Sequence, residues 1–169
     1  MNQKIIDLYD RFTHGGMGRR EFLDRLARLT GGSGAAMAVL PLLQNDYRRQ
    51  IVPQDHPDLT VSTAEWDAPG VRMSGYLARR KGGGQRPGVI VIHENRGLNP
   101  HIKDVTRRFA LEGYLALGVD MLSPLGGTPA DEDQARTMLG TLDAGETVVR
   151  MAAAVPFLAG HPECTGKVG

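Results

Sequence analysis

One continuous apolar run, Gly88-Val89-Ile90-Val91-Ile92, constrains the fold more than any other part of the chain. Its β-branched residues do not alternate with polar ones, which is typical of a strand buried on both faces. Strands of this kind lie in parallel or mixed sheets whose faces are covered by helices. The run therefore predicts an α/β architecture.

A helix and a second apolar strand follow this run. His101 to Glu112 has helical spacing, and Gly113 suits its end. Tyr114 to Asp120 is interpreted as another buried strand. Strand, helix and strand within about 30 residues predict a βαβ unit with a right-handed crossover. The helix is expected to turn its apolar residues to the sheet and its charged residues elsewhere: Ile102, Val105, Phe109 and Ala110 against Lys103, Asp104, Arg107 and Arg108.

The flanking segments extend the alternation of strands and helices. Residues 61–66 and 71–79, joined by a turn at 67–70, predict a partly solvated hairpin at a sheet edge. Helices are expected over 131–139 and 145–158, and a third buried strand from Lys167. The predicted fold class is α/β, with a mixed, mostly parallel sheet flanked by helices. The core face predicted for the last helix comprises Val148, Val149, Met151, Ala152, Val155 and Leu158.

Composition narrows the classes of function. The chain has 169 residues, enough for one domain with a real core, and its 20 basic and 19 acidic residues give a net charge of +1. This balance does not favour a nucleic acid as a partner. One cysteine, Cys164, and five scattered histidines form no recognisable set of metal ligands, so no metal and no cofactor is expected.

The first 45 residues are interpreted as a helical leader. Arg19-Arg20 precedes Phe22-Leu23 and an uncharged run from Leu29 to Leu43, a pattern that resembles a twin-arginine export signal. The run is too short for a stable membrane span, which takes about 20 residues. The alternative is an amphipathic helix from Arg20 to Leu29. If the leader directs twin-arginine export, the protein is expected in the periplasm. If it does not, the protein is expected in the cytoplasm.

A family resemblance lies in residues 87–127, PGVIVIHENRGLNPHIKDVTRRFALEGYLALGVDMLSPLGG, together with the terminal TGKVG. A strand ending in His-Glu, an Arg-Gly-Leu-Asn loop, a helix, Gly-Tyr-x-Ala-Leu and a strand ending in Asp resemble the N-terminal part of the dienelactone hydrolase (carboxymethylenebutenolidase) family of the α/β-hydrolase superfamily. The resemblance covers about residues 65–169. It implies that residues 61–169 are the N-terminal portion of such a domain, a truncated α/β-hydrolase fold. A polar, proline-broken linker is expected at 46–60.

The resemblance implies hydrolysis of lactones or esters by a nucleophile, an acid and a histidine in that chain order. In this family the nucleophile is usually a cysteine in a Gly-x-Cys-x-Gly-Gly turn, just beyond the strand that begins here at Lys167. The sequence ends at Gly169 and contains neither that turn nor Gly-x-Ser-x-Gly. Cys164 precedes the strand without flanking glycines, so we interpret it as an incidental loop cysteine. By this reasoning the chain lacks the triad and is inactive alone.

The family match assigns two residues to the other wall of the site. Glu94 falls on the position whose carboxylate meets the nucleophile's thiol, and a carboxylate there accepts a proton or holds the thiol in a resting state. The alternative is a salt bridge between Glu94 and Arg96. Asn95 is expected to contribute its backbone N–H to the oxyanion hole. Arg136 aligns approximately with a family arginine that helps to hold the substrate carboxylate. The alternative is that Arg136 is a solvated arginine on a helix surface. His93 and Asn99 are expected to shape the loop.

Three functions fit these observations. The first is an N-terminal fragment of a dienelactone hydrolase, which would act on a small-molecule ester or lactone if completed. The second is a non-catalytic accessory or binding module. The third is one half of a split hydrolase. The superfamily's strand order would leave the strand at 88–92 with an open apolar edge, which predicts self-association.

Overall fold

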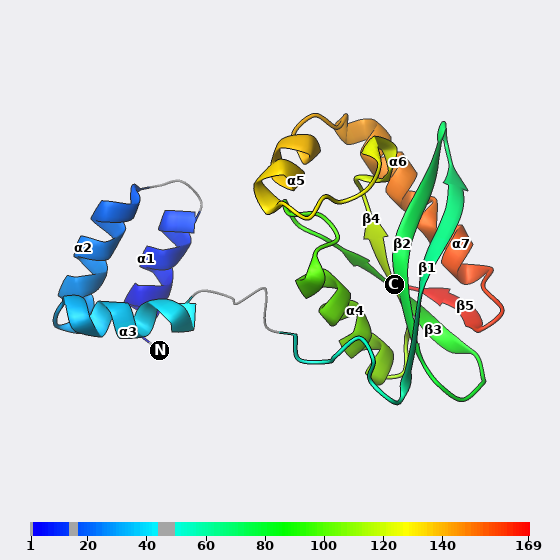
Figure 1. The fold of residues 1–169 in the computed structure, drawn as a ribbon, viewed down its shortest axis with the longest axis horizontal. Helices are drawn as coiled ribbons and strands as arrows, with labels where there is room; N and C mark the ends of the chain where they lie inside the picture. Colours follow the sequence, from blue (N-terminus) through cyan, green and yellow to red (C-terminus); the bar gives the residue numbers. More distant parts are fainter. Residues whose placement is uncertain (1, 14–16, 44–49) are drawn as a thin grey trace. The chain divides into compact units, whose positions relative to one another are not determined.

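The computed structural model describes residues 2–13, 17–43 and 50–169 and divides the chain into two compact units, Met1–Tyr47 and Arg48–Gly169 (Figure 1). Each unit has a hydrophobic core of its own. Residues 46–49 of the predicted linker lie outside the described residues. No described helix is long and apolar enough to cross a membrane.

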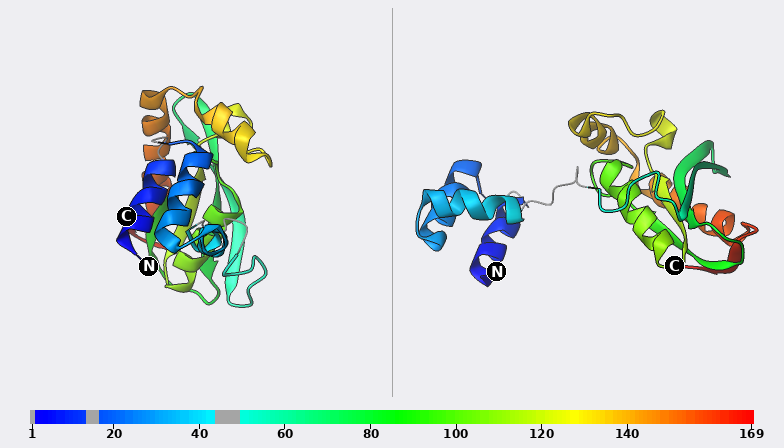
Figure 2. Two further views of the ribbon diagram at one scale, coloured as in Figure 1. Left: turned by 90° about the vertical axis from the view of Figure 1, so that its left-hand side faces the viewer. Right: turned by 60° about the horizontal axis from the view of Figure 1, so that its bottom comes forward.

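The first unit consists of three helices, α1 (Gln3–Thr13), α2 (Arg19–Thr30) and α3 (Ser33–Leu43). α1 and α2 lie side by side, and α3 crosses their ends (Figures 1 and 2). The predicted amphipathic helix at 20–29 is confirmed as α2. It ends at Gly31, whose φ of 86° is a left-handed conformation that suits glycine. The core of this unit is formed by Ile5, Leu8, Phe22, Leu26, Ala36 and Leu40.

The second unit is built on one five-stranded sheet with the order β1-β2-β4-β3-β5. β1 (Leu59–Ala68) and β2 (Val71–Arg80) form the predicted hairpin. β4 (Leu115–Asp120) pairs antiparallel with β2 and parallel with β3 (Arg86–Ile92). β5 (Cys164–Val168) is parallel to β3 at the other edge. The predicted mixed sheet and the βαβ unit are both present.

Helices cover both faces of this sheet (Figure 1). α4 (Pro100–Leu111) packs on the face that carries Tyr76, Ala78 and Ala116. α7 (Ala154–Ala159) packs on the opposite face, where Trp66 and Phe157 stack with ring centroids 5.0 Å apart. Successive residues of a strand point to opposite faces, so β4 contributes side chains to both cores. The unit is therefore a layered α/β domain.

The run at 88–92 is less buried than its sequence predicts. Val89 and Ile90 are half-buried, and Ile92 is 52% exposed, whereas all six residues of β4 are buried. The ladder between β3 and β5 joins Arg86 to Cys164 and Gly88 to Val168, and a last hydrogen bond runs from the Ile90 N–H to the Gly169 carbonyl at 2.8 Å. Beyond Ile90 the strand has a described neighbour on one side alone. The prediction of burial is wrong for Ile92, whereas Val91 is buried as predicted.

The inward face of α4 also differs from the prediction, because Asp104 and Arg107 are buried and Phe109 is 38% exposed. Asp104 Oδ1 accepts hydrogen bonds from the backbone N–H groups of Ile51, at 3.0 Å, and Val52, at 2.7 Å. Arg107 donates to the Val52 carbonyl at 2.7 Å and to the Tyr76 hydroxyl at 3.1 Å. Both charges are buried because they bind the segment that leads into the sheet.

The predicted helix at 145–158 consists of two helices, α6 (Ala144–Ala152) and α7, which meet at Ala153. Leu158 is buried as predicted, but Val148, Val149 and Val155 are 58%, 53% and 45% exposed. The predicted core face is therefore wrong for these valines. Among the described elements none buries this side of α6.

The last strand begins at Cys164, three residues before the predicted Lys167. Cys164 is only 3% exposed and belongs to the core cluster beneath the sheet. It is therefore a core residue of a strand, and its interpretation as a loop cysteine is wrong.

Candidate functional site

The candidate site lies where β3 and β4 end. Because the two strands are parallel and in register from Gly88 with Leu115 to Ile92 with Val119, their carboxyl ends meet at one edge of the sheet. His93, Glu94 and Asn95 directly follow β3, and Asp120 closes β4. Ligands of open α/β sheets bind outside the carboxyl ends of the strands.

Asp120 organises the loops around this edge. Its carboxylate is 7% exposed and accepts hydrogen bonds from the backbone N–H groups of Leu122, at 3.0 Å, and Thr128, at 2.8 Å. The Thr128 hydroxyl donates to Asp120 Oδ1 at 2.8 Å and accepts from the Leu98 N–H at 2.8 Å. These bonds satisfy a buried carboxylate and connect the loop after β3 to the loop after β4.

Gly97 makes this close approach possible. Its φ is 72°, and a Cβ added there would lie 2.4 Å from the Thr128 hydroxyl oxygen. Any larger residue would push the two loops apart and would be strained in its backbone. The predicted Arg-Gly-Leu-Asn loop therefore owes its shape to contact with Thr128.

His93 is a structural link between the two strands. Its Nε2 accepts from the Met121 N–H at 3.1 Å, so Nδ1, 2.7 Å from the Glu94 carbonyl, carries the proton and donates. The side chain is 3% exposed, and burial lowers the pKa of His93. A neutral imidazole with both nitrogens bonded to backbone shapes the loop, as predicted, and has no nitrogen left for a substrate.

A second set of contacts joins the loop to α5 (Glu132–Leu139). Arg96 forms an ion pair with Glu132, so the alternative salt bridge from Glu94 to Arg96 is replaced by this pair. Asn99 Nδ2 donates to Glu132 Oε1 at 3.4 Å, and Asn99 Oδ1 caps α4 by accepting from the Ile102 N–H at 3.0 Å. The loop is thus held at β4, at α5 and at the start of α4.

Glu94 and Asn95 are the two exposed residues in this rigid setting. Within the described parts of the chain, no side-chain hydrogen bond or ion pair engages the Glu94 carboxylate. The structure therefore brings the two predicted site residues together at the carboxyl end of β3, with Glu94 available to an incoming group. The role of each stays a prediction.

Arg136 makes no described contact with the two exposed residues of the loop. It is exposed on α5, one turn after Glu132, and no described contact joins it to Glu94 or Asn95. Cys164 is also remote from the chemistry, since its Sγ lies in the core and 3.9 Å from the Lys167 carbonyl oxygen. A buried thiol of this kind is inert.

Sequence reasoning missed the residues that hold the loop, above all Asp120, Thr128 and Glu132. One signal was present in the sequence. Asp120 stands at the end of an apolar strand, and an aspartate buried there is rarely without hydrogen-bond partners, so partners for it could have been sought. Nothing in the spacing of Thr128 or Glu132 indicated their contacts across 30 and 36 residues with Leu98 and Arg96. Among the described residues, no group of three or more His, Cys, Asp or Glu side chains is arranged to hold a metal ion.

Residues 73–169 match the sequence model of the dienelactone hydrolase family. Residues 1–32 match a second family, described as YqhI-like, and that match includes α1 and α2. The two matches fall on different compact units of the chain.

Named relatives agree with the first match. The chain is 38% identical over 112 residues to YghX of Escherichia coli (strain K12), which is named as a hydrolase fragment; this covers 64% of the chain and 96% of YghX. It is 35% identical over 116 residues to a protein of the same strain named as a carboxymethylenebutenolidase, covering 68% of the chain and 41% of that protein. A Salmonella typhimurium protein of the same name is 40% identical over 91 residues, which cover 52% of the chain and 33% of that protein. The chain therefore spans nearly all of YghX but well under half of the longer relatives.

Solved structures give the same result. A dienelactone hydrolase-like promiscuous phosphotriesterase from metagenomic libraries is 31% identical, with a TM-score of 0.54 over 66% of this chain and 47% of that one. A dienelactone hydrolase-type protein of Klebsiella pneumoniae is 26% identical, with a TM-score of 0.50 over 64% and 48% of the two chains. The esterase Est22 is 11% identical with a TM-score of 0.53, a likeness of fold alone.

Proposed function

Because the chain belongs to the dienelactone hydrolase family, we propose that its second unit supplies the β3-side wall of a site that hydrolyses a small-molecule lactone or ester. The observation that carries this proposal is the pair Glu94 and Asn95, exposed at the carboxyl end of β3 on a loop held at three places. Catalytic groups work best when their supports are rigid.

Each residue of the pair has a distinct proposed role. The Glu94 carboxylate would meet the nucleophile's thiol and accept its proton or hold it at rest. Asn95 would donate its backbone N–H to the oxyanion of the tetrahedral intermediate, where a second N–H comes from the residue after the nucleophile. Arg136, one turn along α5, is proposed to attract the substrate carboxylate and to matter less than Glu94.

The 169 residues contain no nucleophile turn, so we expect no triad catalysis from this chain by itself. The test is hydrolysis of p-nitrophenyl acetate and of a dienelactone by the purified protein, followed spectrophotometrically. Turnover equal to that of buffer supports the proposal. Turnover that disappears in Cys164→Ala would overturn it, because it would make the buried thiol the nucleophile.

A chimera tests the proposed site directly. The part of the Escherichia coli carboxymethylenebutenolidase relative that follows its matched segment would be joined after Gly169. If the wall is intact, the chimera hydrolyses the dienelactone. We expect Glu94→Gln to lower its kcat by about 10²-fold, within the range for a positioned proton-transfer group. Glu112→Gln, an exposed glutamate just after α4, is the matched control and should have no effect.

A split hydrolase is the second candidate, favoured by the β3 edge. The pairing with β5 ends at Ile90, whose N–H donates to the Gly169 carbonyl at 2.8 Å, and Ile92 is 52% exposed beyond it. An exposed apolar edge pairs with another chain, either a complementary half or a second copy. Size-exclusion chromatography with light scattering distinguishes these states. We expect self-association that Ile92→Lys reduces, whereas a soluble monomer that unfolds cooperatively would favour the accessory module.

We also propose that residues 1–45 act as a twin-arginine leader. The supporting observation is that Arg19 and Arg20 are exposed at the start of α2 and precede the uncharged run. A reporter that is active only after export in the folded state, fused to residues 1–45, tests this proposal. Export abolished by replacing both arginines with lysine supports it, and export that is unchanged or never seen overturns it.

A further inference from the structure

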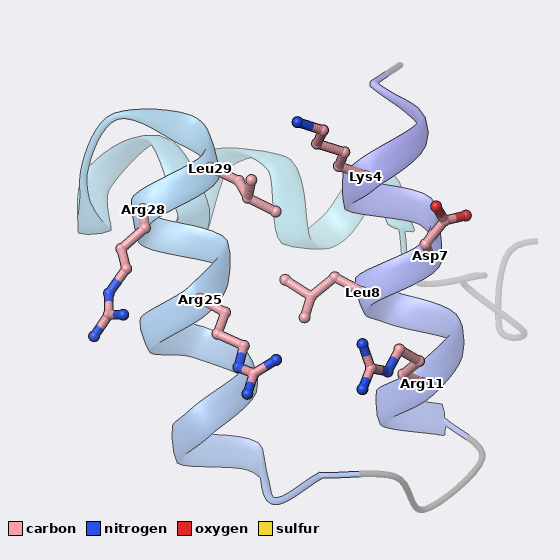
Figure 3. Close-up of a pocket in the computed structure, with 7 residues that line it drawn as sticks. All are labelled: Lys4, Asp7, Leu8, Arg11, Arg25, Arg28 and Leu29. Carbon is pink, nitrogen blue, oxygen red and sulfur yellow. The ribbon is translucent and has the colours of Figure 1, made fainter.

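The first unit has a hollow of about 440 Å³ between α1 and α2, which the hydrolase proposal does not use (Figure 3). Small-molecule sites in proteins have volumes of roughly 300–1,000 Å³. The hollow therefore has the size of a site for a small organic ligand. All of its lining residues belong to the first unit.

The lining combines an apolar floor with cationic rims. Leu8 points into the space between the helices, and Leu29 lies across from it on α2 (Figure 3). Leu8 is packed into the core and 7% exposed, whereas Leu29 is 40% exposed. Four cationic side chains and one carboxylate complete the lining: Lys4, Arg11, Arg25, Arg28 and Asp7.

Two of the cations face one another. The guanidinium groups of Arg11 and Arg25 extend from opposite helices toward the space below Leu8, while Arg28 points away from α1 (Figure 3). Arg25 forms an ion pair with Glu21 on its own helix, at 2.7 Å. Among the described residues, Arg11 has no ion-pair partner. Two guanidinium groups that face each other across an open hollow repel, and an anion between them would relieve that repulsion.

The carboxylate in the lining does not fill this role. Asp7 Oδ1 accepts a hydrogen bond from Gln3 Nε2 at 2.8 Å, and its side chain points outward from the hollow in Figure 3. A second copy of the chain is also a poor occupant, because its equivalent surface carries the same excess of positive charge. A polyanion such as a nucleic acid requires a longer basic track than this hollow, whose α1 side spans about 10 Å from Lys4 to Arg11.

We propose that this hollow binds an amphipathic organic anion. Its carboxylate or phosphate head lies between Arg11 and Arg25, and its apolar body rests on Leu8 and Leu29. Planar guanidinium forks suit either head group, since both accept paired N–H donors. The shared chemistry is an anionic head on a hydrocarbon body, and the two sources are carboxylic acids and phosphorylated lipids.

The test is isothermal titration calorimetry of the full chain with four probes: octanoate, octyl phosphate, octyl glucoside and inorganic phosphate. We expect at least one of the amphipathic anions to bind about tenfold more tightly than both the neutral detergent and inorganic phosphate. Tighter binding of octyl phosphate identifies phosphorylated lipids as the source, and tighter binding of octanoate identifies carboxylic acids. Absence of binding by both anions, or equal binding of octyl glucoside, overturns the proposal.

Variants separate the clamp from the general charge of the unit. The double variant Arg11→Gln/Arg25→Gln should weaken binding about tenfold. Arg19→Gln removes an exposed arginine of the same unit that does not line the hollow, and it should leave the affinity unchanged. If circular dichroism shows that the double variant has lost helix, Arg11→Lys/Arg25→Lys is used in its place. This variant keeps both charges but loses the guanidinium forks, so it should bind more weakly than the wild type but by less than tenfold. Unchanged binding in the folded double variant contradicts the proposal. No ester hydrolysis enters this test, so its outcome is independent of the hydrolase proposal.

Discussion

The two parallel strands β3 and β4 lie side by side. β3 has the more apolar sequence, but β4 is the more deeply buried strand. β3 carries the unbroken apolar run GVIVI, and β4 carries LALGVD with a charged end. Nevertheless all six residues of β4 are buried, whereas Ile92 of β3 is 52% exposed. β4 has a paired strand on each side along its length, whereas the pairing of β3 with β5 ends at Ile90. The hydrophobicity of a strand therefore does not decide its burial by itself, because the strands and helices that cover it also count.

The comparison predicts its largest effect in the core of β4. Leu117→Ala removes a side chain with no exposed surface from the cluster beneath the sheet, so we expect it to lower the free energy of unfolding by about 2–5 kcal/mol. Ile92→Ala in β3 should change it by less than about 0.5 kcal/mol, as for most surface sites. Urea unfolding followed by circular dichroism measures both. Equal losses at the two positions would mean that β3 is covered in solution, for example by self-association.

A smaller effect is expected where the two strands end. Thr128→Val keeps the shape of the side chain but removes the hydrogen bonds to Asp120 Oδ1 and from the Leu98 N–H. Leaving these buried groups without partners should cost about 1–3 kcal/mol in the free energy of unfolding. The control is Thr137→Val on the exposed side of α5, where the hydroxyl bonds only a helix carbonyl. If both variants lose the same stability, Thr128 does not hold the loops together.

The smallest expected effect depends on pH and involves His93. Burial lowers its pKa in the folded state, so below about pH 6.5, the ordinary value, the unfolded chain binds a proton that the folded chain resists. This contribution to stability is complete above pH 6.5 and is lost as the pH falls toward the lowered pKa. We expect His93→Gln to flatten the pH dependence of urea unfolding between pH 5 and 7.

The control for this prediction is His56→Gln, since His56 is half-buried in a turn far along the chain from the candidate site. An identical pH dependence in wild type and His93→Gln would show that another group dominates acid destabilisation.

The sequence predicted the order of strands and helices in the second unit, because hydrophobic period and turn residues are local signals. Glu94 and Asn95 were singled out by the family resemblance, and their roles stay a prediction. Sequence reasoning failed where burial depends on partners distant in the chain. Asp104 and Arg107 look like surface residues of a helix, and only their contacts with residues 50–52 explain their burial. Val148 and Val149 look like core residues, and no described element covers them. The loop contacts of Thr128 and Glu132 leave no local signal at all.

The ion pair between Arg107 and Asp104 bears on where the second unit should be cut for separate study. A protein trimmed at residue 61, where the strand pattern begins, would lose the Val52 carbonyl, the Gln50 side chain and two backbone donors. It would leave a guanidinium that is 2% exposed and a carboxylate that is 1% exposed beneath a newly opened surface. Water would then reach the underside of α4. A protein that begins at or before residue 50 keeps these contacts, and residues 50–52 continue to cover the buried ion pair.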